Sequence, residues 1–300
     1  MVDDTRSANR AAQLVEALSG EMPLNLSAAE AACDVAARIA ALPRSASSVF
    51  VGINGAQGSG KSTLTRLVAE ALARFHGLRA AGMSLDDFYL TRAERLRLAR
   101  EVHPLCATRG VPGTHDVELM RATIARLCGA QASETTPIPA FDKLADDRAP
   151  PADWPVFTGR PGVIMLEGWC VGVRRGDLPP YEGPINELER AEDPDGVWYR
   201  WSIEALGRGY EDLWDGFDLL VSIEVPDLET VIDSRLRQED TLAAGSNGGG
   251  AGRPRMDRAA VIRFVQHYER YTRALWAAMP GRADMLYRRD RDYGFTLIKG

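Results

Sequence analysis

The sequence predicts an α/β fold of three layers, with a parallel β-sheet between two layers of helices. Short apolar runs, rich in β-branched and aromatic residues, alternate with longer segments of helical periodicity. Strands that are apolar on both faces are typical of a parallel sheet covered by helices. The chain has 300 residues, of which 45% are hydrophobic, and this is enough for one large domain with insertions.

The first part of the chain predicts two helices that precede the sheet. Residues 8–42 are rich in alanine and have helical apolar spacing, and Pro23 separates the two helices. Ser27 is a candidate N-cap for the second helix. We therefore divide the chain into a helical N-terminal extension, residues 1–46, and a main domain, residues 47–300.

About five strands are expected in the main domain. Each is a short apolar run bounded by turn residues or by a change to helical periodicity. The runs lie at residues 48–53, 80–88, 162–169, 217–225 and 283–289.

Helices are expected between these strands, because the apolar residues there recur with helical spacing. The helical segments are residues 61–75, 117–127, 228–240 and 257–279. Residues 135–161 are rich in proline and aspartate and predict an ordered loop, whereas residues 243–253 are rich in glycine and predict a flexible hinge. Residues 228–258 are a candidate lid insertion.

Composition and charge argue against a nucleic-acid-binding protein, a zinc-site protein and a membrane protein. The net charge is −6 and the sequence pI is about 5.4, and no basic block indicates a nucleic-acid partner. The four cysteines are scattered without the spacing of a zinc site. No signal peptide and no apolar run of about 20 residues is present. We therefore expect a cytoplasmic protein without a membrane span.

A phosphate-binding loop follows the first expected strand. Residues 55–62, GAQGSGKS, match the pattern G-x-x-x-x-G-K-S/T in full, between a strand and a helix as the motif requires. Backbone N–H groups of such a loop surround the phosphates of a nucleotide, which we take to be ATP. Lys61 can reach the terminal phosphates, and Ser62 can bind Mg²⁺. The residues expected to contact the nucleotide are Gly55, Ala56, Gln57, Gly58, Ser59, Gly60, Lys61, Ser62 and Thr63.

The motif alone leaves the class of nucleotide-binding protein open, and other features narrow it. The chain has no N-K-x-D segment for reading guanine and no LSGGQ-like signature of a transport ATPase. A small-molecule kinase needs a carboxylate near the γ-phosphate, support for a metal ion, an acceptor pocket and a lid that excludes water. The sequence is compatible with such an enzyme.

Carboxylates follow two of the expected strands. Asp86 and Asp87 come after the second strand, and Glu167 ends the third. Ligands of parallel sheets bind beyond the carboxyl ends of the strands, so Lys61, Asp86 and Glu167 should lie close together. We expect these three residues to be catalytic, with Ser62, Asp86 and Glu167 serving the metal ion. The sequence does not separate a role of Asp86 as base from a role as metal ligand through water.

These segments resemble the P-loop kinases grouped with uridine kinase, phosphoribulokinase and bacterial pantothenate kinase. The segment SLDDFY places Asp86 where those enzymes carry an aspartate before an aromatic pair. The segment PAFDKLADDR resembles the P-x-Y-D-x-x-x-x-x-R segment of uridine kinases, with Phe141 in place of the tyrosine, Asp142 as the aspartate and Arg148 as the arginine.

Within that group the chain is most similar to the D-glycerate 3-kinases of plant and fungal type. The segments that carry the resemblance are GINGAQGSGKSTL, SLDDFYLT, RGVPGTHD, FDKLADDR, LEGWCVG and FVQHYERYTRALW, and they span residues 52–276. The resemblance implies transfer of the γ-phosphate of ATP to the 3-hydroxyl of D-glycerate. Asp86 would then be the base, with Mg²⁺ as the metal ion.

A glycerate carboxylate needs a cation, and arginine suits it because its guanidinium binds two oxygens at once. Arg109 and His115 in RGVPGTHD are the best candidates, followed by Lys143 and Arg148. Lysine is rare in this chain, occurring only at positions 61, 143 and 299, which draws attention to Lys143. The expected acceptor residues are Arg109, His115, Asp142, Lys143 and Arg148, and the expected lid residues are Arg235 and Arg237.

Two alternatives remain at this point. The protein could be another small-molecule kinase of the same fold, for pantothenate or a nucleoside, or a nucleotide-sensing module without catalysis. The sequence also leaves open whether Asp86 or Asp87 is the base, and it does not predict the oligomeric state.

Overall fold

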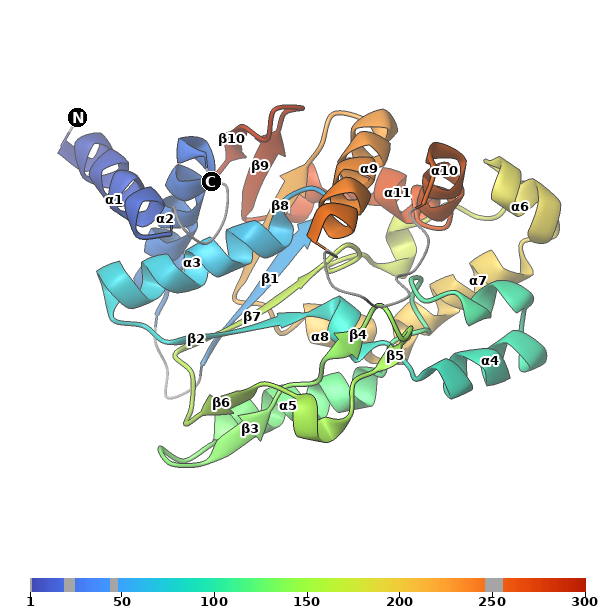
Figure 1. The fold of residues 1–300 in the computed structure, drawn as a ribbon, viewed down its shortest axis with the longest axis horizontal. Helices are drawn as coiled ribbons and strands as arrows, with labels where there is room; N and C mark the ends of the chain where they lie inside the picture. The colour runs from blue at the N-terminus through green and yellow to red at the C-terminus, as the bar shows by residue number, and fades with distance from the viewer. Residues whose placement is uncertain (1, 19–24, 44–47, 246–255) are drawn as a thin grey trace.

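A computed structural model describes residues 2–18, 25–43, 48–245 and 256–300, without the side chains of residues 2–7 and 241–245. Its centre is a mostly parallel sheet with helices on both faces, which confirms the predicted fold class (Figure 1). The sheet has six strands in the order β10 (Phe295–Lys299), β9 (Met285–Arg289), β8 (Leu219–Glu224), β1 (Val49–Gly55), β7 (Val163–Gly168) and β2 (Ala80–Ser84).

All neighbouring strands of this sheet are parallel except β9 and β10, which pair antiparallel. The five strands expected from the sequence are confirmed, and β10 is an addition at the edge. The buried strands β1 and β7 lie at the centre, side by side. Their carboxyl ends therefore bring the phosphate loop and Glu167 to the same edge of the sheet.

Three helices cover one face of the sheet: α1 (Val2–Leu18), α2 (Leu26–Ala41) and α3 (Lys61–His76). They share one hydrophobic cluster with the strands, in which Ile39 from α2, Leu67 from α3 and Val51 from β1 are fully buried. The predicted N-terminal helices thus pack on α3, the helix that follows the phosphate loop.

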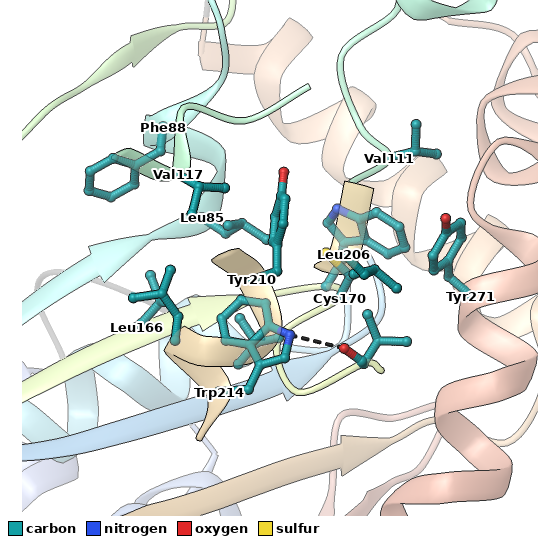
Figure 2. Packing of buried hydrophobic residues seen from close by; sticks show 14 of the residues in the cluster. Leu85, Phe88, Val111, Val117, Leu166, Cys170, Leu206, Tyr210, Trp214 and Tyr271 are labelled. Carbon is teal, nitrogen blue, oxygen red and sulfur yellow. Dashed lines mark hydrogen bonds between the residues drawn. The ribbon is translucent and has the colours of Figure 1, made fainter. Parts of the chain in front are cut away.

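The other face is covered by α5 (Val117–Gly129), α7 (Val197–Ala205), α8 (Glu211–Trp214) and α11 (Glu269–Arg282). Their cluster is rich in large aromatic side chains, as Figure 2 shows for Tyr210, Trp214 and Tyr271. The indole N–H of Trp214 donates to the carbonyl of Val173 at 3.0 Å, so this buried polar group is satisfied.

The remaining helices lie beyond the carboxyl ends of the strands (Figure 1). They are α4 (Arg92–Glu101), α6 (Glu187–Glu192), α9 (Leu228–Gly245) and α10 (Arg258–Gln266). Short 3₁₀ turns occupy Leu85–Phe88, Pro104–Ala107, Pro151–Asp153 and Arg175–Asp177. A kink within Leu206–Tyr210, with non-helical backbone angles at Arg208 and Gly209, joins α7 to α8. None of the described helices combines the length and the apolar character that a membrane crossing requires.

Two details of the predicted helices need correction. Ser27 is not the N-cap of α2, because Asn25 takes that position and accepts from the Ala28 N–H at 2.8 Å. The helix expected at 257–279 is two helices, α10 and α11. At the break, the N–H of Tyr268 bonds three residues back to the carbonyl of Val265.

The loop expected at residues 135–161 contains two small antiparallel ladders. One joins β3 (Thr135–Pro137) to β6 (Val156–Thr158), and the other joins β4 (Phe141–Asp142) to β5 (Asp147–Arg148). The β4–β5 turn lies near α9 at the carboxyl edge of the sheet (Figure 1). Most of the expected hinge at 243–253 falls on residues 246–255, which lie outside the described residues.

Candidate active site

The phosphate loop joins β1 to α3 and depends on glycine at two positions. Gly58 and Gly60 have φ of +72° and +90°, which L side chains rarely adopt. A Cβ on Gly58 would also lie 2.5 Å from the Cβ of Ser234 on α9. The loop ends at the N-terminus of α3, where unpaired N–H groups and the helix dipole favour an anion.

Glu167, at the end of β7, faces the start of α3. The Ser62 hydroxyl donates to Glu167 Oε1 at 2.7 Å, and Lys61 Nζ lies 3.9 Å from Glu167 Oε2. Glu167 is 5% exposed, and its buried Oε2 accepts no hydrogen bond in the described chain. A buried carboxylate oxygen beside a serine hydroxyl is the hard oxygen chemistry that Mg²⁺ prefers, with phosphate oxygens and water as further ligands. These residues fit a magnesium ion.

A pocket of about 290 Å³ opens beside this pair. It lies beyond the carboxyl ends of the strands, and residues from the phosphate loop, the turn after β2, the β4–β5 turn and α9 line it. The lining residues are Gln57, Gly58, Lys61, Ser62, Ser84, Asp86, Asp87, Tyr89, Arg109, Lys143, Glu167, Trp169, Arg235, Gln238, Phe264 and Tyr268. The structure therefore brings Lys61, Asp86 and Glu167 into one cavity.

Asp86 and Asp87 have opposite electrostatic surroundings. Burial acts to raise the pKa of Asp86, but the nearby charges of Lys143 and Lys61 outweigh it and lower this pKa to about 2. Lys143 Nζ contacts Asp86 Oδ2 at 2.9 Å, and the Tyr89 hydroxyl donates to Asp86 Oδ1 at 3.2 Å. Asp86 is therefore ionised at neutral pH.

The pKa of Asp87, in contrast, is raised to about 6, mainly by burial and further by the charge of Asp86. The Phe141 N–H donates to Asp87 Oδ1 at 3.3 Å. This bond ties the turn after β2 to β4. Asp87 thus holds β4 in place, whereas Asp86 presents its carboxylate to the pocket cations.

Two further cations, from different segments, line the pocket. Arg109 pairs with Asp146 in the β4–β5 turn, and its guanidinium lies 5.3 Å from the centre of the Phe141 ring. Its backbone carbonyl accepts from the Tyr268 hydroxyl at 3.1 Å. Lys143, from the same turn as Asp146, is 62% exposed. Arg109 and Lys143 can both reach an anion in the cavity.

Three expected acceptor residues do not line the pocket. His115 is 5% exposed, stacks on Tyr89 at 4.5 Å and shares a hydrogen bond of 2.9 Å with the Tyr210 hydroxyl. Burial lowers the pKa of His115 to about 3, so its imidazole is neutral and unsuited to holding a carboxylate by charge. The Asp142 carboxylate accepts backbone N–H groups of its own turn, and Arg148 pairs with Asp116 at 3.0 Å.

Only one of the two expected lid arginines on α9 lines the pocket. Arg235 lines the pocket, pairs with Glu239 and lies 5.2 Å from the centre of the Phe264 ring. Arg237 lies over Tyr293 at 5.6 Å, outside the pocket lining. Gln238, one turn after Arg235, lines the pocket although the sequence did not single it out.

Other pocket residues were also missed. Trp169, Phe264 and Tyr268 carry no prediction from the sequence, and all three contribute to the lining. Their only sequence signal was proximity to LEGW and HYERY, because an aromatic side chain in a core and one in a pocket wall look the same in a sequence. They give the cavity an apolar part of its wall.

A glycine-rich phosphate loop, a serine–glutamate pair and an adjoining polar pocket at the edge of a parallel sheet define a P-loop phosphotransferase. No family model matches the chain. It is 32% identical over 226 residues to the uncharacterized kinase mug58 of Schizosaccharomyces pombe, covering 73% of this chain and 78% of the relative. The chain belongs to the family of P-loop kinases that includes this relative and the plant D-glycerate 3-kinase.

The plant member is the chloroplastic D-glycerate 3-kinase of Arabidopsis thaliana. It is 30% identical over 245 residues, which are 79% of this chain and 50% of the plant protein. Among solved structures, D-glycerate 3-kinase of Cryptococcus neoformans superposes with a TM-score of 0.64 at 24% identity, covering 91% of this chain and 97% of that one. This structural likeness supports the fold.

Proposed function

We propose that the protein transfers the γ-phosphate of ATP to the 3-hydroxyl of D-glycerate, giving 3-phosphoglycerate. The observation that supports this best is a single pocket in which Lys61 of the phosphate loop, the ionised Asp86 and the cations Arg109 and Lys143 face one another. Such a pocket suits a small anionic acceptor beside a nucleotide. The relationship to a plant enzyme named D-glycerate 3-kinase points to the same acceptor.

The donor side would be held by the phosphate loop. N–H groups at the start of α3 bind phosphate oxygens, and Lys61 stabilises charge on the transferring phosphoryl group. Ser62 and Glu167 would hold Mg²⁺, which neutralises negative charge on the β- and γ-phosphates when bound. Arg235 and Gln238 approach the same cavity from α9 and would close it against water.

The acceptor side would be held by Arg109 and Lys143, which bind the glycerate carboxylate. Asp86 accepts the proton of the 3-hydroxyl as the new O–P bond forms and the bond to the leaving ADP oxygen breaks. A carboxylate with a pKa of about 2 is a weak base. In phosphoryl transfer its main task is to orient the hydroxyl, because catalysis in this class rests on positioning and electrostatics.

Lys143 gives the site a way to respond to its acceptor. It contacts Asp86 directly at 2.9 Å, so an acceptor carboxylate would compete with Asp86 for it. When Lys143 turns to the acceptor, Asp86 loses its nearest cation and becomes a better proton acceptor. Acceptor binding would thus raise the basicity of the group that receives the proton.

The test is an acceptor panel with ATP and Mg²⁺, measured as acceptor-dependent ADP release. The panel contains D-glycerate, L-glycerate, pantothenate and uridine, and ³¹P NMR of the product separates phosphorylation at O3 from that at O2. We expect turnover with D-glycerate and a phosphate on O3. Turnover with pantothenate or uridine but not with glycerate would replace this proposal by another small-molecule kinase. ATP binding without ADP release for any acceptor would favour a sensing module. A cytoplasmic location stays a prediction.

A further inference from the structure

Arg289, at the end of β9, is a fully buried cation behind the phosphate loop. Its side chain is 0% exposed, and it donates to the carbonyl of Gly58 at 2.7 Å and to the hydroxyl of Ser234 at 2.8 Å. It also donates to the carbonyl of Asp290 at 2.9 Å and lies 4.3 Å from the centre of the Tyr293 ring. Its hydrogen-bond acceptors in the described chain are thus all neutral oxygens.

A buried charge whose hydrogen-bond acceptors are all neutral is costly, because a protein interior stabilises an ion less well than water does. Burial accordingly lowers the pKa of the Arg289 guanidinium below its usual value. Two of its three hydrogen-bond partners belong to the phosphate loop and to α9. The charge is therefore buried at the point where these two elements meet. A polyanion bound on the opposite side of the loop would be attracted by this charge.

The geometry of the loop shows what Arg289 fixes. The peptide between Gly58 and Ser59 is held at both ends: its carbonyl accepts from Arg289, and its N–H donates to the Ala56 carbonyl at 3.1 Å. Fixing this peptide plane fixes the part of the loop where Gly58 has φ of +72°. The phosphate-binding shape is then present before a nucleotide arrives, which lowers the entropic cost of binding.

The second partner of Arg289 connects the loop to α9. Ser234 accepts from Arg289 and packs so closely against Gly58 that no Cβ fits between them. The next residue on α9, Arg235, and Gln238 one turn later line the pocket. A shift of the phosphate loop would therefore displace Ser234, and with it α9, the helix that carries these pocket residues.

We infer that Arg289 is a positioning residue that holds the phosphate loop in its anion-binding shape and couples it to helix α9. Nucleotide binding and the ordering of α9 should then favour each other reciprocally. This inference rests on the nucleotide-binding part of the proposed function and is independent of the acceptor.

The test compares Arg289→Met with Arg288→Met. Arg288 is the preceding residue on β9, but its side chain is 54% exposed and pairs with Glu224 at 3.3 Å. Affinity for ADP and for ATP with Mg²⁺ is measured by titration calorimetry without any acceptor. We expect Arg289→Met to weaken both nucleotides by about tenfold or more, with Arg288→Met within about twofold of the wild type. Circular dichroism confirms that each variant is folded.

The coupling is tested by hydrogen exchange of residues 228–240 with and without ADP. We expect ADP to slow exchange there in the wild type and in Arg288→Met. In Ser234→Ala, which removes only the α9 partner of Arg289, this slowing should shrink by at least half while the affinity for ADP changes less than in Arg289→Met. A merely structural role for Arg289 would lower the melting temperature without changing the response of α9 to ADP.

Wild-type nucleotide affinity in a folded Arg289→Met variant would overturn the inference. If Arg289→Met does not fold, the test uses Arg289→Lys and Ser234→Ala in its place. Wild-type affinity for ADP and wild-type hydrogen exchange of residues 228–240 in both variants would then overturn the inference. Failure here is distinct from failure of the proposed function, because the measurement contains no acceptor. A negative acceptor panel with weakened nucleotide binding in Arg289→Met would leave the inference standing.

Discussion

At the scale of single residues, the adjacent carboxyl groups Asp86 and Asp87 have different tasks. Asp86 contacts the pocket lysine and the Tyr89 hydroxyl, and its pKa is lowered to about 2. Asp87 accepts a backbone N–H from Phe141, and its pKa is raised to about 6. The sequence left open which of the two is the base. The contacts favour Asp86 as the group that meets the acceptor.

This assignment predicts unequal effects of the same substitution. Asp86→Asn should lower kcat by about 10²- to 10⁴-fold, because the hydroxyl loses its proton acceptor, while the affinity for ATP changes little. Asp87→Asn is the matched control, since asparagine can still accept from the Phe141 N–H, and its kcat should stay within about tenfold. Steady-state kinetics with D-glycerate check both. Equal losses in the two variants would contradict the assignment.

Asp87 also predicts a pH dependence of stability. Its folded pKa is about 6 and its unfolded value is 3.8, so the folded state binds more protons between these values. Stability from this group is therefore greatest below about pH 4 and is lost as the pH rises through 6.

The loss amounts to at most about 3 kcal/mol for a shift of this size. Asp87→Asn should consequently be more stable than the wild type at pH 7.5, with the difference shrinking toward pH 5. Urea denaturation at the two pH values measures it. An equal difference at both pH values would show that Asp87 is not the group responsible.

Arg109 predicts a selective effect on the acceptor. Arg109→Ala should raise the KM for D-glycerate by about tenfold or more, since a charge-assisted hydrogen bond contributes about 1.5 to 3 kcal/mol. The KM for ATP should change little, because the contacts of Arg109 are with Asp146, Phe141 and Tyr268 and not with the phosphate loop. Arg109→Lys should give a KM for D-glycerate between those of the wild type and Arg109→Ala, because lysine keeps the charge but not the two-pronged geometry. An unchanged KM for glycerate in Arg109→Ala would remove Arg109 from the acceptor site.

At the scale of elements, a buried arginine organises the acceptor side. Arg95 on α4 is 0% exposed and donates to the carbonyls of Leu90, Ala107 and Asp146. It also pairs with the Asp146 carboxylate at 3.1 Å, and the same carboxylate pairs with Arg109. Arg95 therefore ties three segments together and holds the β4–β5 turn that carries Lys143.

Removing this link should affect both stability and acceptor binding. Arg95→Met leaves three partly buried carbonyls and the Asp146 carboxylate without their donor and should destabilise the protein by about 2 to 4 kcal/mol. Any folded enzyme should show a raised KM for D-glycerate with a nearly normal KM for ATP. Arg97→Met, at an exposed position of the same helix, is the control and should change neither. Urea denaturation and steady-state kinetics check the pair, and a raised KM for ATP alone would contradict this role.

The helices and strands also show which parts of the structure could be predicted from the sequence. The buried strands and the phosphate loop were predictable, because apolar runs and a glycine motif are local signals. Strand β10 was missed, since four of its five residues are exposed and it has no continuous apolar run. His115 was placed in the acceptor site by its neighbours in RGVPGTHD, but its side chain turns inward to Tyr210. Arg95 and Arg289 could not be singled out, because only tertiary packing distinguishes a buried arginine from the many exposed ones.

At the scale of the whole molecule, α2 belongs to the same core as the phosphate loop helix. Its buried face packs on α3, and Tyr287 of β9 donates to the carbonyl of Ala31 at 3.3 Å. Ser27 accepts from the N–H of Phe295 at 2.9 Å. The Phe295 ring in turn lies 3.3 Å from the position of a Cβ on Gly60. The N-terminal helices thus support the layer on which the nucleotide site is built.

This arrangement predicts that residues 1–46 are not a dispensable extension. Ile39→Ala, at a position with 0% exposure, should lower the free energy of unfolding by about 2 to 5 kcal/mol, because it removes buried methyl groups and leaves a cavity. Leu26→Ala, on the same helix but 51% exposed, should cost less than about 1 kcal/mol.

The fragment 47–300 should lose cooperative unfolding and nucleotide affinity together, since the apolar face of α3 would meet water. Thermal unfolding and calorimetric titration with ADP measure these effects, and a fragment that melts within a few degrees of the full chain and binds ADP normally would show that α1 and α2 are a separate addition.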